Sequence, residues 1–331
     1  MKKTVAITGG SGFIGAYLVK RMAQDGWNVK VVDSMFRGSL SRLSNLKDEI
    51  EIFETDIRNE KELSKIFIGV DLVIHLAAIN GTENFYKHPE MVFDIGVIGA
   101  ISVVNACRES KVYDLIIASS AEVYQTPSVI PTPEDTPLML PNSDNPRYSY
   151  GGSKIASELI AFNYGKDYFR KMQVFRPHNI YGPDMGWKHV VPQLIQKIQK
   201  SALIENDKVK LNIQGDGKET RAFCYVDDVV DGILNMYHNG EHRKVYHIGN
   251  DHEISILELA KNIGDAMGVK LDIISGDAAV GGTPRRCPDI TRMRNIGYEP
   301  KFDIGSGIKL TVDWYQENQE TQPRTRIRRF L

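Results

Sequence analysis

A glycine-rich stretch near the start of the chain restricts the possible folds more than any other feature. The segment TGGSGFIG, residues 8–15, follows a short apolar run and precedes an amphipathic pattern that ends at Gly26. A second apolar run, NVKVVD, then ends at Asp33. Strand, glycine turn, helix and strand in this order predict a βαβ unit, in which a crossover helix joins two parallel strands.

The glycines of this turn predict a dinucleotide site. They read either as GxGxxG, with Gly10 first, or as GxxGxxG, with Gly9 first. In both readings backbone N–H groups can approach a pyrophosphate, and the start of the helix favours its negative charge. The residues that we expect to bind the cofactor here are Gly9, Gly12, Phe13, Ile14 and Gly15.

Asp33 indicates which dinucleotide is bound. A carboxylate about 20 residues beyond the glycines can accept both ribose hydroxyls of an adenosine, and it repels a 2′-phosphate. This favours NAD over NADP as the cofactor. Arg37 nearby would suit a phosphate, although a loop arginine is more often simply solvated. Asp56, after a third apolar run, either reaches the adenine amino group or caps the helix predicted over RNEKELSKIF, and the sequence leaves both open.

Strand-like and helix-like segments keep alternating as far as Pro177. This pattern predicts an α/β fold with a Rossmann-type, doubly wound parallel sheet. The pattern then loosens, which indicates a smaller α/β lobe for the substrate. We assign residues 1–177 and 223–250 to the NAD-binding domain, 178–222 and 251–320 to the nucleotide-sugar-binding lobe suggested by the resemblance below, and 321–331 to a basic tail.

Composition excludes several classes of protein. The 331 residues carry a formal charge of −1, so nothing in the overall charge favours nucleic acid or a membrane surface. No apolar run approaches the roughly 18 residues of a membrane span, so we expect a cytoplasmic protein. The three cysteines lack metal-ligand spacing, and we expect free thiols and no metal site. Four arginines near the C-terminus predict a solvated tail.

Tyr150 and Lys154 stand four residues apart at the start of a predicted helix, so their side chains share one face. An ammonium group beside a phenol favours the phenolate and lowers its pKa from about 10. Such a phenolate can take a proton from a hydroxyl while hydride leaves the carbon. Pairs of this kind are also common on exposed helix faces, so the pair alone does not establish catalysis.

Motifs along nearly the whole chain resemble those of the extended short-chain dehydrogenases/reductases, in particular the nucleotide-sugar epimerases and dehydratases. Besides the glycine turn and Asp33, the motifs that carry the resemblance are HLAA, SSAEVY, YGGSK, RPHNIYGP, GDGKETRAFCYVDD and RRCPDI. The resemblance implies a catalytic triad of Ser120, Tyr150 and Lys154, with Lys154 also on the nicotinamide ribose. It also implies cofactor contacts from Ile57 and Ala77.

The same resemblance implies three residues that bind the nucleotide diphosphate of a nucleotide-sugar substrate. Asn179 and Arg221 match the family's motifs, and Arg286 is a further candidate that neighbouring Arg285 could replace. Guanidinium groups suit this role because they contact phosphate in a bidentate manner. Asp228 and Asp289 fall in the same motifs but are interpreted as structural. A homodimer is implied as well, formed through MVFDIGVIGAISVVNAC and the helix that carries Lys154.

The chain departs from the family pattern at two places. Gly96 replaces an asparagine that often stands three residues before the glycine that is here Gly99. Ala121 stands beside Glu122, where dehydratase relatives have an acid next to a glutamate base.

A 4-epimerase does not need such an acid, since the keto sugar only rotates and takes hydride back. We therefore predict epimerisation at C4, with Glu122 as an additional candidate catalytic residue. A 4,6-dehydratase or a glucuronate-type decarboxylase that uses Glu122 is the alternative. A dinucleotide-binding sensor without turnover is a remote one.

Overall fold

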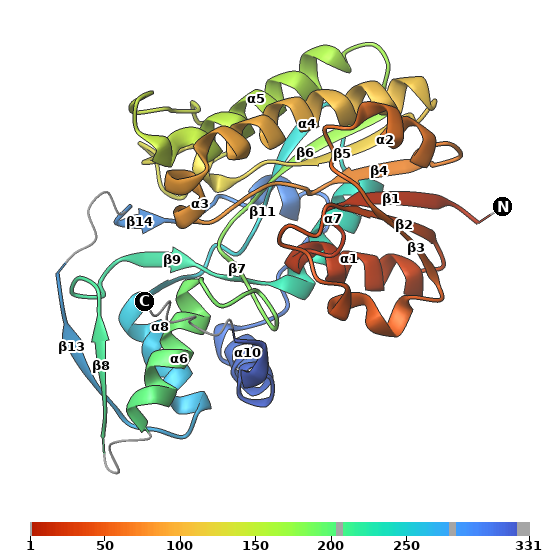
Figure 1. The fold of residues 1–331 in the computed structure, drawn as a ribbon. Helices are drawn as coiled ribbons and strands as arrows, with labels where there is room; N and C mark the ends of the chain where they lie inside the picture. Colours follow the sequence, from red (N-terminus) through yellow and green to blue (C-terminus); the bar gives the residue numbers. More distant parts are fainter. Residues whose placement is uncertain (1, 203–207, 278–282, 323–331) are drawn as a thin grey trace, which may run out of the picture. The chain divides into compact units, whose positions relative to one another are not determined.

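Seven parallel strands form one sheet in the order β11-β6-β5-β4-β1-β2-β3 (Figure 1). The computed structural model describes residues 2–202, 208–277 and 283–322. The strands are β1 (Thr4–Thr8), β2 (Asn28–Asp33), β3 (Ile50–Glu54), β4 (Leu72–His75), β5 (Asp114–Ala118), β6 (Lys171–Pro177) and β11 (Lys244–Ile248). The order reverses at β1 and β4, so the predicted doubly wound sheet is confirmed.

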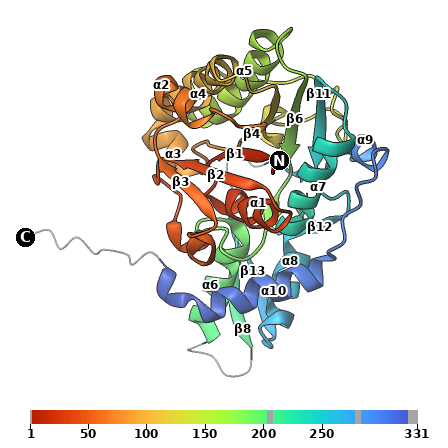
Figure 2. The ribbon, with the colours of Figure 1, turned by 90° about the vertical axis from the view of Figure 1, so that its right-hand side faces the viewer.

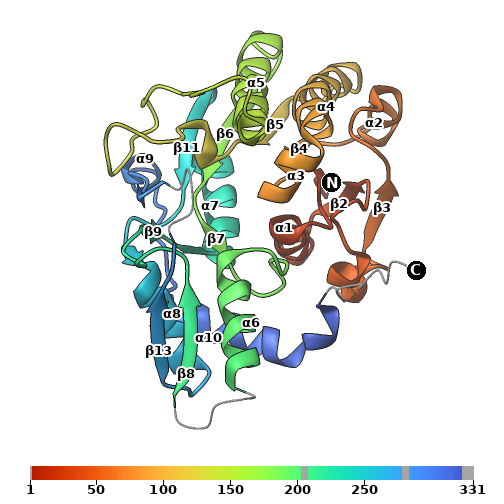
Figure 3. The same ribbon diagram turned by 60° about the vertical axis from the view of Figure 1, so that its left-hand side comes forward.

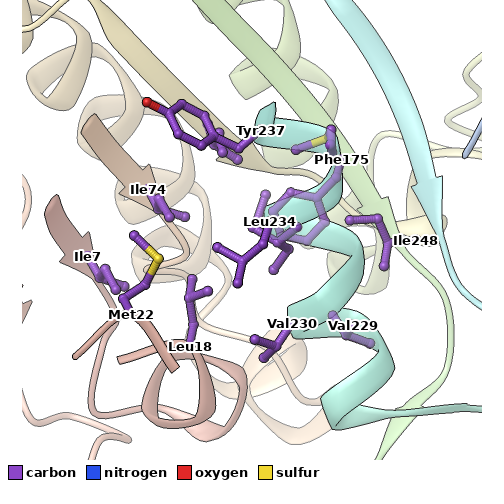
Figure 4. Close-up of a cluster of buried hydrophobic side chains, with 14 of the residues drawn as sticks. Ile7, Leu18, Met22, Ile74, Phe175, Val229, Val230, Leu234, Tyr237 and Ile248 are labelled. Carbon is purple, nitrogen blue, oxygen red and sulfur yellow. The ribbon is translucent and has the colours of Figure 1, made fainter. Parts of the chain in front are cut away.

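Helices cover both faces of this sheet (Figure 2). One face carries α1 (Phe13–Gln24) and α7 (Val226–Asn239), and the other carries α2 (Glu60–Ile66), α4 (Pro89–Glu109) and α5 (Ser149–Tyr164). Figure 4 shows the first face, where Leu18 and Leu234 lie among strand residues such as Ile7 and Phe175. Because both faces are covered, the central strands β1, β4 and β5 are buried along nearly their whole length, whereas the edge strand β3 exposes Glu51 and Glu54.

Helix α4 corrects one expectation from the sequence. Within the described residues it is long and apolar enough for a membrane span, with a mean hydropathy of 1.6 over its best window. Half of that window is nevertheless buried inside the protein, as in the core helix of a globular domain. Its glycines allow close packing, since a Cβ at Gly96 would lie 2.5 Å from the Cβ of Ser153 on α5. The glycine that departs from the family pattern thus sits where α4 meets the helix of Lys154.

The chain divides into two compact units. The first contains residues 1–180, 222–253 and 285–301, and the second contains residues 181–221, 254–284 and 302–331. Segment 285–301, which the sequence placed in the substrate lobe, therefore belongs with the nucleotide-binding sheet. It carries Arg286 into the same unit as the catalytic residues. The tail arginines lie outside the described residues.

The second unit contains two parallel strands and three longer helices (Figure 3). These are β8 (Val209–Ile213), β13 (Leu271–Ser275), α6 (Val190–Ala202), α8 (Ile256–Ala266) and α10 (Ile304–Glu317). A capping box of Ser255 and Glu258 starts α8 and satisfies N–H groups of its first turn.

Short elements make up the rest of the described chain. They are η1 (Leu40–Leu46), α3 (Thr82–Lys87), η2 (Ala121–Val123), η3 (Pro146–Tyr148), β7 (Ile180–Tyr181), β9 (Thr220–Ala222), β10 (Cys224–Tyr225), β12 (Glu253–Ser255), β14 (Arg285–Arg286), α9 (Thr291–Arg294) and η4 (Gln319–Thr321).

Candidate functional site

The glycine turn approaches the end of β4 so closely that side chains are excluded. Gly9 has a φ of 71°, and a Cβ on it would lie 2.8 Å from the backbone nitrogen of Ala77. A Cβ on Gly15 would lie 2.1 Å from the carbonyl oxygen of Gly9. The tightest approaches therefore favour the GxxGxxG reading. They leave the start of α1, at Phe13 and Ile14, beside a bare backbone turn that suits a pyrophosphate.

Asp33 is buried at the end of β2 with its carboxylate held by two backbone donors. Ser11 N–H donates to Oδ2 at 3.1 Å, and Met35 N–H donates to Oδ1 at 2.9 Å. A carboxylate has about four acceptor positions, so it can still accept ribose hydroxyls. The guanidinium of Arg37 instead donates to the carbonyl oxygen of Asn80 at 2.6 Å.

Asp56 does not cap a helix, so that alternative is wrong. Its carboxylate pairs with the guanidinium of Arg58 at 2.6 Å and accepts the Arg58 N–H at 2.9 Å. The side chain that caps α2 is Asn59, which accepts the Glu62 N–H at 3.3 Å. The hydrogen bond from Arg58 lowers the pKa of Asp56. The contact of Asp56 with adenine stays a prediction.

The structure brings Ser120, Tyr150 and Lys154 together at the end of β5. The hydroxyl of Ser120 lies close enough to the Tyr150 phenol to lower its pKa. Lys154 Nζ donates to the carbonyl oxygen of Ala118 at 2.7 Å and lies 5.8 Å from the centre of the Tyr150 ring. Phe85 stacks on Tyr150 with ring centres 5.3 Å apart, which shields the phenol from water. Ser120 also caps the short η2 turn by accepting the N–H of Glu122.

The electrostatics of Tyr150 differ from the sequence expectation. Burial raises its pKa to about 12, and the nearby carboxylate of Glu122 adds to this. The hydrogen bond from Ser120 and the charge of Arg37 oppose the shift without cancelling it. Burial also lowers the pKa of Lys154 to about 8, against the charge of Glu158. Low dielectric surroundings thus disfavour both charged forms, which the i,i+4 spacing alone did not reveal.

Glu122 pairs with Arg286, whose segment follows it by more than 160 residues. The Oε1 of Glu122 lies 2.7 Å from Nη1 of Arg286, and their side chains are 30% and 15% exposed. Arg285 turns elsewhere and pairs with Glu253 at 2.6 Å, so the two arginines are distinguished. Arg286 is therefore the one beside the catalytic residues.

The other predicted substrate residues hold backbone groups. Asn179 Nδ2 donates to the carbonyl oxygen of Ala222 at 3.2 Å, and Asn179 itself has a φ of 43°. In the second unit, Arg221 donates to the carbonyl oxygen of Thr283 at 2.7 Å. Their contacts with a diphosphate stay predictions. Asp228 and Asp289 are structural, because each accepts a backbone N–H, from Lys301 and Thr291 respectively.

A buried polar group behind the triad was missed by the sequence analysis. Glu158 accepts hydrogen bonds from Ser119 and Arg176, and all three side chains are buried. The available signal was the spacing on α5, because Glu158 lies one turn after Lys154 on the same face.

Comparison with known proteins agrees with this geometry. Residues 5–249 match the model of the NAD dependent epimerase/dehydratase family. The chain belongs to this family. A putative UDP-glucose 4-epimerase from Methanocaldococcus jannaschii is 30% identical to it, over 96% of this chain and all of the relative. UDP-glucuronic acid decarboxylase 1 from Xenopus tropicalis is 29% identical, over 97% of this chain and 74% of the relative.

Solved structures of family members have the same fold. A UDP-glucose 4-epimerase from Thermotoga maritima with UDP-glucose has a TM-score of 0.84 at 25% identity, covering 96% of this chain and 99% of the other. The dTDP-glucose 4,6-dehydratase DesIV from Streptomyces venezuelae, with NAD bound, has a TM-score of 0.83 at 25% identity, covering 96% and 98%. These relatives differ in reaction, so membership establishes an NAD-dependent enzyme but not its product.

The residues of this family member fit NAD. The backbone turn at Gly9 and Gly15 has no room for side chains, and Asp33 retains acceptor positions for ribose hydroxyls. When bound, NAD accepts the hydride that the reaction removes from its substrate. The contact of Lys154 with the nicotinamide ribose stays a prediction.

Proposed function

We propose that the protein is an NAD-dependent nucleotide-sugar epimerase that acts through a transient 4-keto sugar. One observation carries the proposal. The groups needed to oxidise a hydroxyl are assembled at Ser120, Tyr150 and Lys154, whereas Glu122, the group needed for further chemistry, has Ala121 beside it in place of a second acid. The similarity to the Methanocaldococcus and Thermotoga proteins supports the same reaction.

In this mechanism Tyr150 takes the proton of the C4 hydroxyl as hydride leaves C4. Ser120 shares a hydrogen bond with that hydroxyl and keeps it aligned with the phenol. As an ammonium, Lys154 would stabilise the phenolate against the burial that raises the pKa of Tyr150, and bound NAD would supply the hydride acceptor. After the keto sugar has rotated, Tyr150 returns the proton as hydride adds to the other face.

The test is incubation of the purified protein and NAD with a panel of UDP- and dTDP-sugars, with products resolved by mass and NMR. A C4 epimer of unchanged mass is expected. Loss of water or of carbon dioxide would contradict epimerisation, and no product from any sugar with NAD tightly bound would favour a sensor. Tyr150→Phe is expected to abolish turnover while NAD still binds, and full activity in that variant would refute the mechanism.

A second candidate is dehydration or decarboxylation through Glu122. The contact between Glu122 and Arg286 favours it, because a substrate anion that attracts Arg286 would release Glu122 beside Tyr150. Glu122→Gln separates the two. An epimerase should keep its rate within about tenfold, whereas removal of an essential general base lowers the rate by roughly 10²–10⁴-fold.

We also propose a homodimer formed through α4 and α5. The helices leave large apolar side chains exposed, among them Phe93, Ile98 and Leu159, which is 58% exposed. Light scattering is expected to give twice the mass of one chain, and Leu159→Glu is expected to reduce that mass to one chain.

A further inference from the structure

We propose that Glu158 is a positioning residue of this site: its carboxylate joins the helix that carries Lys154 to the end of the strand that precedes Ser120, one helical turn from Lys154. The inference rests on the proposed hydride chemistry. It concerns a step shared by epimerases, dehydratases and decarboxylases of the family, so it does not depend on which product forms.

The hydrogen bonds of Glu158 connect three elements. Its Oε1 accepts from Ser119 Oγ, at the end of β5, at 2.5 Å. Both carboxylate oxygens accept from the guanidinium of Arg176 on β6, at 2.8 Å and 2.6 Å. Ser119 precedes Ser120 directly, and Glu158 lies one turn from Lys154 on α5. The hydrogen bond between Glu158 and Ser119 therefore sets the distance between Ser120, which aligns the hydroxyl, and the helix that carries Tyr150 and Lys154.

Burial makes this link rigid and strong. The side chains of Arg176 and Glu158 are 4% and 5% exposed, and Ser119 is equally buried. Arg176 also donates to the hydroxyl of Tyr124 and, at 2.8 Å, to the carbonyl oxygen of Glu134. A buried bidentate pair in which four of the five guanidinium donors are used has one favourable arrangement, which is what positioning requires.

The charge of Glu158 acts on Lys154. The other titratable groups that face Lys154 are Tyr150 on its own helix and His75 on β4. Burial lowers the pKa of His75 to about 3, so His75 is neutral. Glu158 is thus the group that opposes the desolvation of the Lys154 ammonium, while Arg176, Ser119 and Tyr124 face Glu158 itself.

The first test observes Lys154 without any substrate. Protein labelled with ¹³C at the lysine Cε is titrated by NMR, and the Lys154 signal is assigned by its loss in Lys154→Arg. In Glu158→Gln the midpoint is expected to fall by about one pH unit or more, because a neighbouring anion no longer favours the ammonium. In Glu158→Asp, which keeps the charge, the midpoint is expected to stay close to that of the wild type.

The second test follows hydride transfer from UDP-glucose to bound NAD by the absorbance of NADH. In Glu158→Gln the fall of the rate at high pH is expected to begin at a lower pH than in the wild type. In Ser119→Ala, which removes one hydrogen bond and no charge, this fall is expected at the same pH. Both variants should be slower than the wild type by about tenfold. A purely structural Glu158 would lower the rate at every pH without changing the pH at which the rate falls.

Glu158→Gln leaves Arg176 buried without its anion and can fail to fold. The double variant Glu158→Gln/Arg176→Gln removes both charges, and the Lys154 midpoint is expected to fall by less than in Glu158→Gln, because the lost cation offsets part of the lost anion. An unchanged Lys154 midpoint in a folded variant that lacks Glu158 would overturn the inference. If wild-type protein forms neither transient NADH nor any product with UDP-glucose or the other sugars of the panel, the proposed function fails, and the NMR titration still decides the role of Glu158.

Discussion

Two glutamate–arginine pairs lie near the end of β5, and they differ in how far water reaches them. Glu122 and Arg286 pair at 2.7 Å, with side chains 30% and 15% exposed. Glu158 and Arg176 meet through two contacts, with side chains 5% and 4% exposed. One pair is partly exposed to water, and the other is buried and bidentate.

The difference shows how one site can contain an ion pair that a substrate can break and another that keeps the catalytic residues in position. An accessible pair is stabilised only slightly, so a substrate anion can replace one partner. A buried pair is strongly coupled, because removing one partner leaves a charge that water cannot reach. We therefore interpret the first pair as facing the substrate and the second as fixing the catalytic residues.

The largest difference is expected in stability. Glu158→Ala should lower the free energy of unfolding by about 3–5 kcal/mol, because Arg176 stays buried and unpaired. The matched variant Glu122→Ala should lower it by less than about 1 kcal/mol. Urea unfolding followed by circular dichroism measures both, and equal losses would remove the distinction between the two pairs.

The accessible pair should matter more for the substrate. Arg286→Ala is expected to lower kcat/KM by about 10–100-fold, since a charged hydrogen bond contributes about 1.5–3 kcal/mol. Arg285→Ala is the control, because the neighbouring arginine pairs with Glu253 and should leave kcat/KM within about twofold. Similar losses in both variants would contradict the assignment of Arg286.

Low pH should destabilise the protein through two buried histidines near the buried ion pair and Lys154. Burial lowers the pKa of His247, which is bonded to Tyr124, and of His75 to about 3. Between about pH 6.5 and about pH 3 the unfolded state binds more protons, so stability is lost as the pH falls, by up to about 1.4 kcal/mol per pH unit for each histidine. Urea unfolding between about pH 7 and about pH 5 should show this slope. His247→Gln should reduce the slope by the contribution of one histidine, whereas Glu122→Gln should leave the slope unchanged.

Much of the fold and part of the site could be predicted from local sequence. The glycine turn, Asp33 and the alternating segments predicted the parallel sheet because each signal depends on neighbouring residues. Tyr150 and Lys154 were found because a helix places residues four apart on one face. Asp56 was left ambiguous, since a carboxylate before a helix has no local feature that tells a cap from a pair with Arg58.

The sequence by itself determined the βαβ start and the choice of NAD, and its resemblance to a known family implied the triad, whose catalytic role stays a prediction. Only the tertiary structure decided what surrounds them: Arg286 beside Glu122, Arg176 beside Glu158, and a pKa of Tyr150 that burial raises rather than lowers. The physical reason is that backbone periodicity acts over a few residues. Charge pairing and desolvation depend instead on which distant segments the folded chain brings together and on how much water they exclude.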